Sequence, residues 1–146
     1  MWVDDRGRQF PKMKPEVYRA IIDEAHKHDL KVFIHATDLA DAKDVVRSGV
    51  DALAHPVRRG PIDDEFIQLM KEHGVYQCST VGVGDTSWID EPVLAETMTA
   101  ANIAMLKAEF GSTTEAEADA HALLLENLKR ESDARCAHGA VRRRRH

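Results

Sequence analysis

Two histidines are the residues whose types and spacing best support chemistry in this sequence. His35 ends the apolar run 31–35, and His55 ends the run 52–55. Neutral imidazole nitrogens bind divalent metal ions when two or more of them converge from rigid elements. The spacing therefore predicts that His35 and His55 are a pair of metal ligands. A histidine at a strand end can also simply bond a loop carbonyl, and the sequence leaves that alternative open for each residue.

The predicted pair depends on helices and strands that alternate along the first half of the chain. The pattern predicts helices over 15–28, 39–47 and 63–73, and strands over 31–35, 52–55 and 75–81. Pro15 suits a first helical position, Asp38 is a candidate N-cap, and Gly49 and Gly74 follow helix ends. Short buried strands separated by helices of about ten residues are typical of β/α units around a parallel sheet. The sequence therefore predicts an α/β fold with parallel strands.

Equivalent positions in the three units place further polar residues near the histidines. The segments 28–35, 48–55 and 73–80 share one frame, in which a helix stop is followed seven places later by a polar residue. The carboxyl ends of parallel strands meet at one edge of a sheet, where sites of such folds are built. Thr80 is therefore expected beside His35 and His55, as a candidate substrate contact. Arg58 could receive a substrate carboxylate, although an ordinary loop charge is the simpler reading of it.

The character of the chain changes after residue 81. The run 82–85 reads Gly-Val-Gly-Asp and lacks both the third glycine and the lysine of phosphate-binding loops. Two long helices are predicted beyond it, over 91–110 and 113–133. Long helices that follow a parallel strand are compatible with a lid or an excursion from the sheet.

Composition narrows the class of protein. The chain has 146 residues, a formal net charge of −5 and two cysteines. These numbers predict one soluble domain and exclude a disulfide scaffold. No apolar run approaches the roughly 20 residues of a membrane span, and residues 1–14 lack the apolar stretch of a secretory signal. A reducing compartment, the cytoplasm, is favoured.

The charge divides the chain at residue 133. Residues 134–146 contain five arginines and no acid, whereas residues 1–133 carry a formal charge of −10. Consecutive arginines can contact nucleic-acid phosphates. The acidic body and the lack of interleaved aromatic residues argue against such binding and favour an unstructured tail. We therefore expect a domain over 1–133 and an atypical arginine-rich segment over 134–146.

The two histidine segments resemble a known family. Phe33-Ile34-His35-Ala36-Thr37, followed by Gly49-Val50-Asp51-Ala52-Leu53-Ala54-His55, is similar to the fifth and sixth strands of the amidohydrolase superfamily, in its imidazolonepropionase and dipeptidase-like branch. The resemblance covers residues 2–80 well and the long helices more loosely. It implies a partial parallel β/α barrel of the TIM type, from the end of strand four to strand seven, with long helices attached.

The resemblance also implies a metal-dependent activity. In the family, histidines at these two places are ligands of one ion in a mono- or binuclear site, and His35 and His55 match them. Zinc is the metal most expected. Such a site activates water and polarises a carbonyl, so the implied reaction is hydrolysis of an amide, cyclic amide or peptide-like carbon–nitrogen bond in a small-molecule substrate.

The departures from the family pattern are equally informative. The first-strand His-x-His pair, the fourth-strand lysine and the eighth-strand aspartate are not found here. Trp2-Val3-Asp4-Asp5 resembles the stretch just past that lysine, and residues 134–146 replace the expected strand ending in Gly-Thr-Asp. We therefore expect a fragment whose last thirteen codons are out of frame. With two ligands it should be poorly active, because catalytic zinc usually has three protein ligands.

A second interpretation keeps the fold and drops the catalysis. A partial barrel exposes strand edges, and unpaired edges invite association. The chain could therefore be a non-catalytic α/β remnant, or a subunit that needs another chain to complete the barrel.

Overall fold

The computed structural model of the chain describes residues 1–4, 11–81, 87–110 and 114–138. Three β/α units come first: α1 (Pro15–Lys27), β1 (Phe33–Ile34), α2 (Leu39–Arg47), β2 (Ala52–Leu53), α3 (Asp64–His73) and β3 (Tyr76–Gln77). A helical segment follows, with the 3-10 helix η1 (Ser87–Asp90), α4 (Val93–Thr97) and α5 (Ala100–Phe110). The long helix α6 (Glu115–Asp133) then leads to β4 (Ala137–His138).

The strands form one parallel sheet in the order β1-β2-β3-β4. Residues Ile34, Leu53 and Gln77 occupy one register row across β1, β2 and β3, and all three are fully buried. A parallel bridge joins Trp2 to His35, so the first residues of the chain lie along the outer side of β1. The predicted parallel α/β fold is confirmed, and the described strands form an open sheet rather than a closed barrel.

Local signals in the sequence begin and end the helices. Asp38 caps α2, because its carboxylate accepts a 3.0 Å hydrogen bond from the Ala40 amide. Asp63 caps α3 in the same way, at 2.9 Å from the Phe66 amide. Gly74 ends α3 with a left-handed φ of 62°, a conformation that glycine adopts without steric cost. These residues fix where each helix stops and the next strand can begin.

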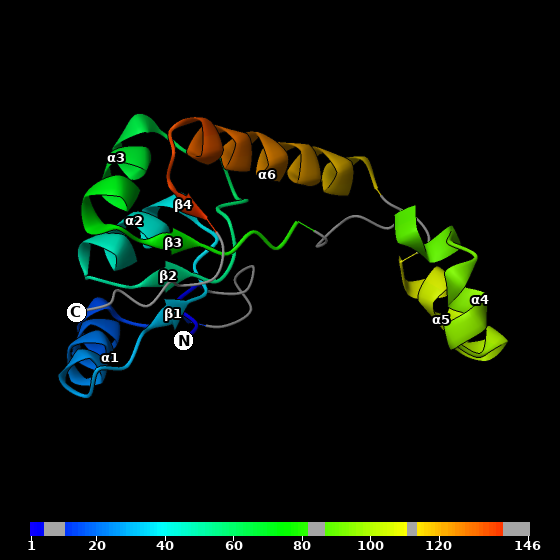
Figure 1. Cartoon of the computed structure of the whole chain (residues 1–146), viewed down its shortest axis with the longest axis horizontal. Helices are drawn as coiled ribbons and strands as arrows, with labels where there is room; N and C mark the ends of the chain where they lie inside the picture. Colours follow the sequence, from blue (N-terminus) through cyan, green and yellow to red (C-terminus); the bar gives the residue numbers. More distant parts are fainter. Residues whose placement is uncertain (5–10, 82–86, 111–113, 139–146) are drawn as a thin grey trace.

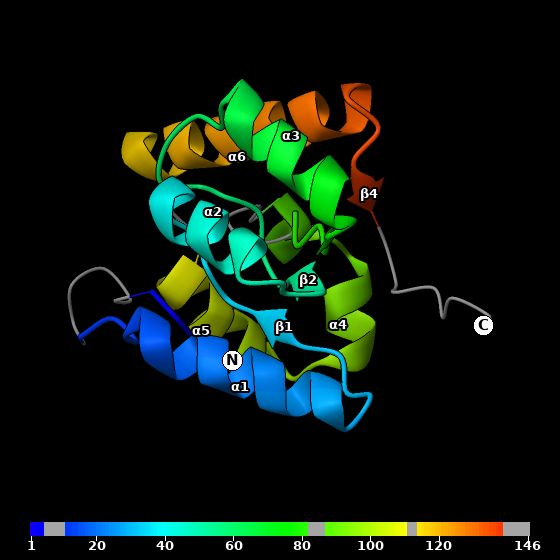
Figure 2. The ribbon, with the colours of Figure 1, turned by 90° about the vertical axis from the view of Figure 1, so that its left-hand side faces the viewer.

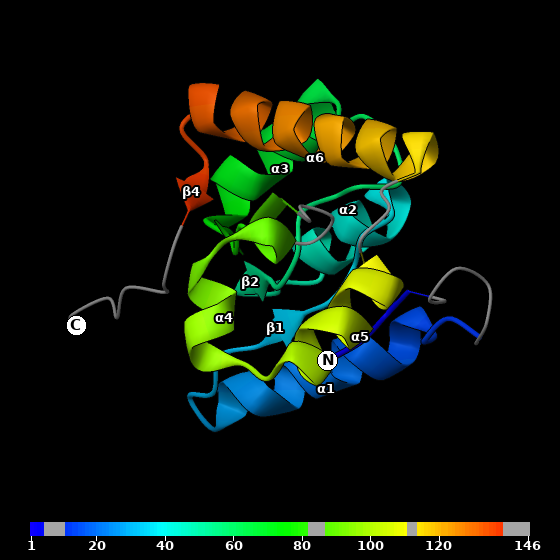
Figure 3. The ribbon, with the colours of Figure 1, turned by 90° about the vertical axis from the view of Figure 1, so that its right-hand side faces the viewer.

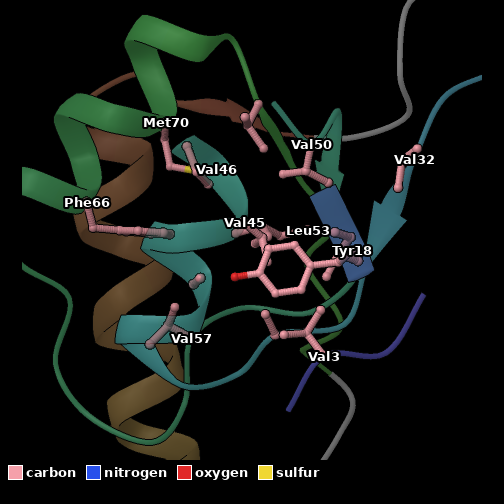
Figure 4. Close-up of a cluster of buried hydrophobic side chains, with 14 of the residues drawn as sticks. Val3, Tyr18, Val32, Val45, Val46, Val50, Leu53, Val57, Phe66 and Met70 are labelled. Carbon is pink, nitrogen blue, oxygen red and sulfur yellow. The ribbon is translucent and has the colours of Figure 1, made fainter. Parts of the chain in front are cut away.

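The hydrophobic core lies between the sheet and the helices α1, α2 and α3 (Figures 2 and 4). Helix α2 contributes Val45 and Val46, and α3 contributes Phe66 and Met70, all at 1% exposure or less. Burial of side chains of this size stabilises a fold by roughly 1.5–3 kcal/mol each. This packing holds the strand ends of β1 and β2 in place.

Helix α1 turns a different face to the core than its apolar spacing suggests. The sequence places Val17 and Ile21 on one face, yet both are more than 40% exposed. Tyr18 and Ile22 are buried instead. The Tyr18 hydroxyl also donates to the Asp44 carboxylate on α2, a polar anchor that apolar periodicity does not register.

The predicted helix over 91–110 is wrong as a single helix. Met98 has extended backbone angles, φ −130° and ψ 152°, and separates α4 from α5. Both helices lie well away from the sheet in Figure 1, and the view of Figure 3 places them in front of the strands. Helix α6 runs back from this segment to the β/α units. The structure therefore contains an excursion, which we define as residues 87–110.

Strand β4 is an element that the sequence did not predict. Its residues Ala137 and His138 pair with Tyr76 and Gln77 of β3, so the start of the segment 134–146 takes part in the sheet. Cys136 is buried against the core, and its amide donates to the Glu131 carbonyl at 2.9 Å. The turn at the end of α6 and the buried Cys136 side chain thus lie where the chain reaches β3. Residues 139–146, with four of the tail's arginines, lie outside the described residues.

In the part of the chain that the structure describes, no helix is long and apolar enough to cross a bilayer.

Candidate metal centre

The structure brings the two predicted histidines together. His35 directly follows β1, and His55 lies two residues beyond β2, at the carboxyl ends of neighbouring parallel strands. Their ring centroids are 4.6 Å apart, and the rings meet edge to face at 76°. Two imidazoles in this arrangement converge on one small volume from two rigid strands.

A buried carboxylate faces one nitrogen of His35. The Asp4 Oδ2 atom lies 3.1 Å from His35 Nε2, and both side chains are buried. The other nitrogen, His35 Nδ1, is also buried and has no hydrogen-bond partner among the described residues. Burial of a polar atom without a partner is costly, so this orphaned nitrogen is a candidate for binding a ligand.

The second histidine is held through the opposite nitrogen. His55 Nδ1 lies 2.8 Å from the Thr80 hydroxyl oxygen, which follows β3. Thr80 is therefore placed beside the histidines as predicted, and its contact in the structure is with His55. This contact leaves Nε2 of His55 available for a ligand.

Both histidines are poised to be neutral near pH 7. Burial lowers the pKa of His35 below its usual value, and this effect outweighs the opposing attraction of Asp4. Burial and the positive charge of Arg58 lower the pKa of His55. Neutral imidazole is the form that binds metal, so these shifts suit a pair of metal ligands.

The loop after His55 carries Arg58 close to the pair. Both the Arg58 and Arg59 amides donate to the Thr37 carbonyl, at 3.1 and 3.3 Å. Helix α6 holds the far end of the same loop through Asn127, whose side chain accepts from the Ile62 amide at 2.9 Å and donates to the Val57 and Gly60 carbonyls, each at 2.9 Å. The position of Arg58 thus depends on contacts from two directions.

The imidazole nitrogens of His35 and His55 fit a metal ion as two of its ligands. His35 and His55 offer neutral nitrogens, one of them orphaned and buried. Among residues 1–4, 11–81, 87–110 and 114–138, no group of three or more His, Cys, Asp or Glu side chains is arranged to hold a metal ion. Catalytic zinc usually takes three protein ligands, so the described residues supply part of such a site.

Sequence reasoning missed Asp4 and Asn127. Asp4 reaches the site because residues 1–4 run beside β1, with the Val3 amide donating to the His35 carbonyl at 3.0 Å. Treating the short run before Asp4 as one more strand would have placed this acid at the same sheet edge as the histidines. Asn127 sits 70 residues from Val57, and no local signal relates the two.

Comparison with known structures supports the fold. A Xaa-Pro dipeptidase with methionine bound in its active site superposes with a TM-score of 0.57 at 19% identity, over 89% of this chain and 28% of the dipeptidase. Ochratoxinase from A. niger gives a TM-score of 0.55 at 24% identity, over 87% of this chain and 25% of that one. A prolidase complexed with N-methylphosphonate-L-proline gives 0.58 at 24% identity, over 90% and 28%.

The chain shares its fold with the matched parts of this dipeptidase, this ochratoxinase and this prolidase. It spans under a third of the length of each of these structures. Neither the models of known protein families nor the curated proteins give a match to the sequence. The resemblance expected from the two histidine segments is thus confirmed by the solved structures that the chain is similar to.

Proposed function

We propose that this chain is part of a metal-dependent hydrolase that cleaves carbon–nitrogen bonds in small amide, cyclic amide or dipeptide-like substrates. The observation that carries the proposal is the convergence of His35 and His55, 4.6 Å apart, at the carboxyl ends of parallel strands. The likeness to a Xaa-Pro dipeptidase, an ochratoxinase and a prolidase supports the choice of reaction.

In the proposed site, His35 Nδ1 and His55 Nε2 bind one divalent metal ion, most simply Zn²⁺. A bound metal ion supplies the Lewis acidity that makes water a nucleophile and polarises an amide carbonyl. Remaining ligands, and the other strands of a closed TIM-type barrel of about 250 residues, would come from outside this chain. The isolated chain is therefore proposed to bind metal weakly and to be a poor catalyst.

Two further residues are proposed to contact substrate. Arg58 is partly exposed beside both histidines, and its guanidinium can pair with a substrate carboxylate through two parallel hydrogen bonds. Thr80 has a hydroxyl that can keep its contact with His55 and still bond a second group. A dipeptide-like substrate with a free carboxylate fits this charge.

Metal analysis tests the proposal directly. The purified full chain, titrated with Zn²⁺ against a chromophoric chelator, should bind one ion weakly. His35→Ala and His55→Ala should each abolish the binding, because each removes half of the donor set. His26→Ala is the matched control, since His26 contacts Asp51 on the surface of the domain. Binding that survives both substitutions at His35 and His55 would contradict the proposal.

The alternative of a non-catalytic remnant or subunit rests on the incomplete donor set among the described residues. It predicts no zinc binding by the chain in the same titration. Self-association through the outer strands of the open sheet stays a prediction of that alternative.

A further inference from the structure

We propose that Asp4 is a positioning residue for His35: its carboxylate holds the ring with Nε2 protonated, so that Nδ1 is the atom presented to the metal. This inference rests on the proposed function for the identity of the ligand that Nδ1 receives. The arrangement of Asp4 and His35 itself is independent of it.

The Asp4 carboxylate is fixed within the fold. Its Oδ2 atom accepts hydrogen bonds from the Thr37 amide at 3.1 Å and from the Thr37 hydroxyl at 2.7 Å. Its Oδ1 atom accepts from Trp2 Nε1 at 2.7 Å. The residue is 3% exposed. Because both oxygens are held by donors from the surrounding backbone and side chains, the carboxylate cannot swing away from His35 without breaking these bonds.

The backbone brings the two residues together as well. The Val3 amide donates to the His35 carbonyl at 3.0 Å, and the His35 amide donates to the Met1 carbonyl at 2.7 Å. The Trp2 ring stacks on the His35 ring at a centroid distance of 3.7 Å and an interplanar angle of 25°. The ring of His35 is thus restrained on its face by Trp2 and at one nitrogen by Asp4.

The chemistry of the pair decides which nitrogen carries the proton. An ionised carboxylate is only an acceptor, so the ring nitrogen that faces it must be the donor. A neutral imidazole has one N–H, and placing it on Nε2 leaves Nδ1 with a free lone pair. The lone pair is on the atom that is buried without a partner among the described residues. Metal-binding histidines commonly donate their other N–H to a carboxylate in this way.

The position of Asp4 does not suit a metal ligand at His35 Nδ1. It lies against Nε2, on the other side of the ring from Nδ1. A metal ion held by Nδ1 would therefore have Asp4 on the far side of the imidazole. The carboxylate acts on the metal through His35, by fixing the ring and raising its basicity.

Nitrogen NMR of the metal-free full chain is the first test. At a pH where His35 is neutral, long-range ¹H–¹⁵N correlations should show a protonated Nε2 and an unprotonated Nδ1 for His35. On addition of Zn²⁺, the Nδ1 resonance should shift. A protonated Nδ1 in the wild-type chain would overturn the proposal without any variant having been made.

Zinc affinity is the second test, read by chelator competition on the same chain. Asp4→Asn keeps the size of the side chain and removes the charge, and it should weaken zinc binding by roughly 10- to 100-fold. Thr37→Val is the matched control, because it removes one hydroxyl bond to the same carboxylate oxygen and leaves the contact with His35. Its zinc affinity should stay within about twofold of wild type. Asp4→Glu, which restores the charge, should recover part of the affinity lost in Asp4→Asn.

The outcomes separate this inference from the proposed function. If His35→Ala abolishes zinc binding and Asp4→Asn leaves both zinc affinity and the His35 proton position unchanged, the role of Asp4 is wrong and the metal site stands. If His35→Ala leaves zinc binding unchanged, the metal site is wrong, and the NMR measurement still decides the proton position. Equal losses in Asp4→Asn and Thr37→Val would indicate a general structural role and would overturn the specific one.

Discussion

The β/α units and the excursion contain similar apolar residues but bury them to different extents. Helices α2 and α3 bury Val45, Val46, Phe66 and Met70 against the sheet. In α4 and α5, the side chains that the structure describes include none that is buried, and Met105 is 60% exposed. Contacts within the excursion connect its helices, such as the 2.6 Å ion pair between Lys107 and Asp90. An apolar residue in a helical pattern therefore becomes core only where the fold supplies a surface to bury it.

The difference has a consequence for stability. Free energy of unfolding accumulates where apolar surface is removed from water, and exposed helices contribute little of it. The candidate metal centre belongs entirely to the β/α units, which we call the first region. This is so because His35, His55 and Thr80 follow β1, β2 and β3. Changes within the β/α units should therefore affect both stability and the site, whereas changes at the exposed positions of α4 and α5 should leave both nearly intact.

The largest effect is expected at Phe66. Phe66 on α3 is fully buried, so Phe66→Ala should lower the free energy of unfolding by about 3–5 kcal/mol through lost burial and the cavity left behind. Met105→Ala on α5 is the comparison and should change it by less than about 0.5 kcal/mol. Urea denaturation followed by circular dichroism measures both. Equal losses for the two variants would show that the excursion is packed in solution and would break the contrast between the regions.

The sequence predicts the first region well because its signals are local. Asp38 and Gly74 mark helix boundaries through their own backbone and side-chain chemistry, and the structure confirms both. The frame shared by the three units also brings His35, His55 and Thr80 together. Periodicity alone does not predict whether a helix will be interrupted or buried, so it missed the break at Met98 in the excursion.

The parts that sequence reasoning missed depend on contacts between distant segments. Asp4 contacts His35, which lies 31 residues further along the chain, because residues 1–4 run beside β1. Strand β4 forms because α6 returns to the β/α units and turns at Ala134 and Arg135. The buried face of α1 differs from the face that its apolar spacing favours, and it includes Tyr18, whose hydroxyl bonds to Asp44 on another helix. Each of these depends on tertiary packing, and only Asp4 has a local signal, the short run of residues before it.

A smaller effect, with a pH dependence, is expected at Glu131 where α6 rejoins the first region. Glu131 is fully buried, neither carboxylate oxygen has a partner among the described residues, and burial raises its pKa to about 7. The unfolded chain loses this proton near its ordinary value of 4.5, so the folded chain holds more protons between pH 4.5 and 7. Stability contributed by protonated Glu131 is therefore complete at low pH and is lost as the pH rises through about 7.

Glu131→Gln removes this dependence. The free energy of unfolding of the variant minus that of wild type should rise by about 3 kcal/mol as the pH is raised from about 4 to about 8. Exposed Glu109 on α5 is the matched position, and Glu109→Gln should change that free energy by less than about 0.5 kcal/mol at every pH. Urea titrations over the pH range give the comparison. A constant difference between wild type and Glu131→Gln would mean that the Glu131 carboxyl is not buried in the folded chain.

The smallest of these effects, at Asn127, tests whether α6 belongs with the first region. The buried Asn127 side chain satisfies the Ile62 amide and the Val57 and Gly60 carbonyls. Asn127→Ala leaves these groups without their partner, and should cost about 2 kcal/mol in free energy of unfolding. Asn102→Ala, at an exposed position of α5, should cost less than about 0.5 kcal/mol.

Hydrogen exchange locates the effect of Asn127→Ala within the loop that carries Arg58. The Ile62 amide should be protected in wild type and should exchange faster in the variant, because its acceptor has been removed. Amides of α3 should keep most of their protection, since the Asp63 cap and the core contacts of Phe66 remain. Unchanged protection at Ile62 would show that α6 does not hold the loop, and would assign this helix to the excursion instead of the β/α units.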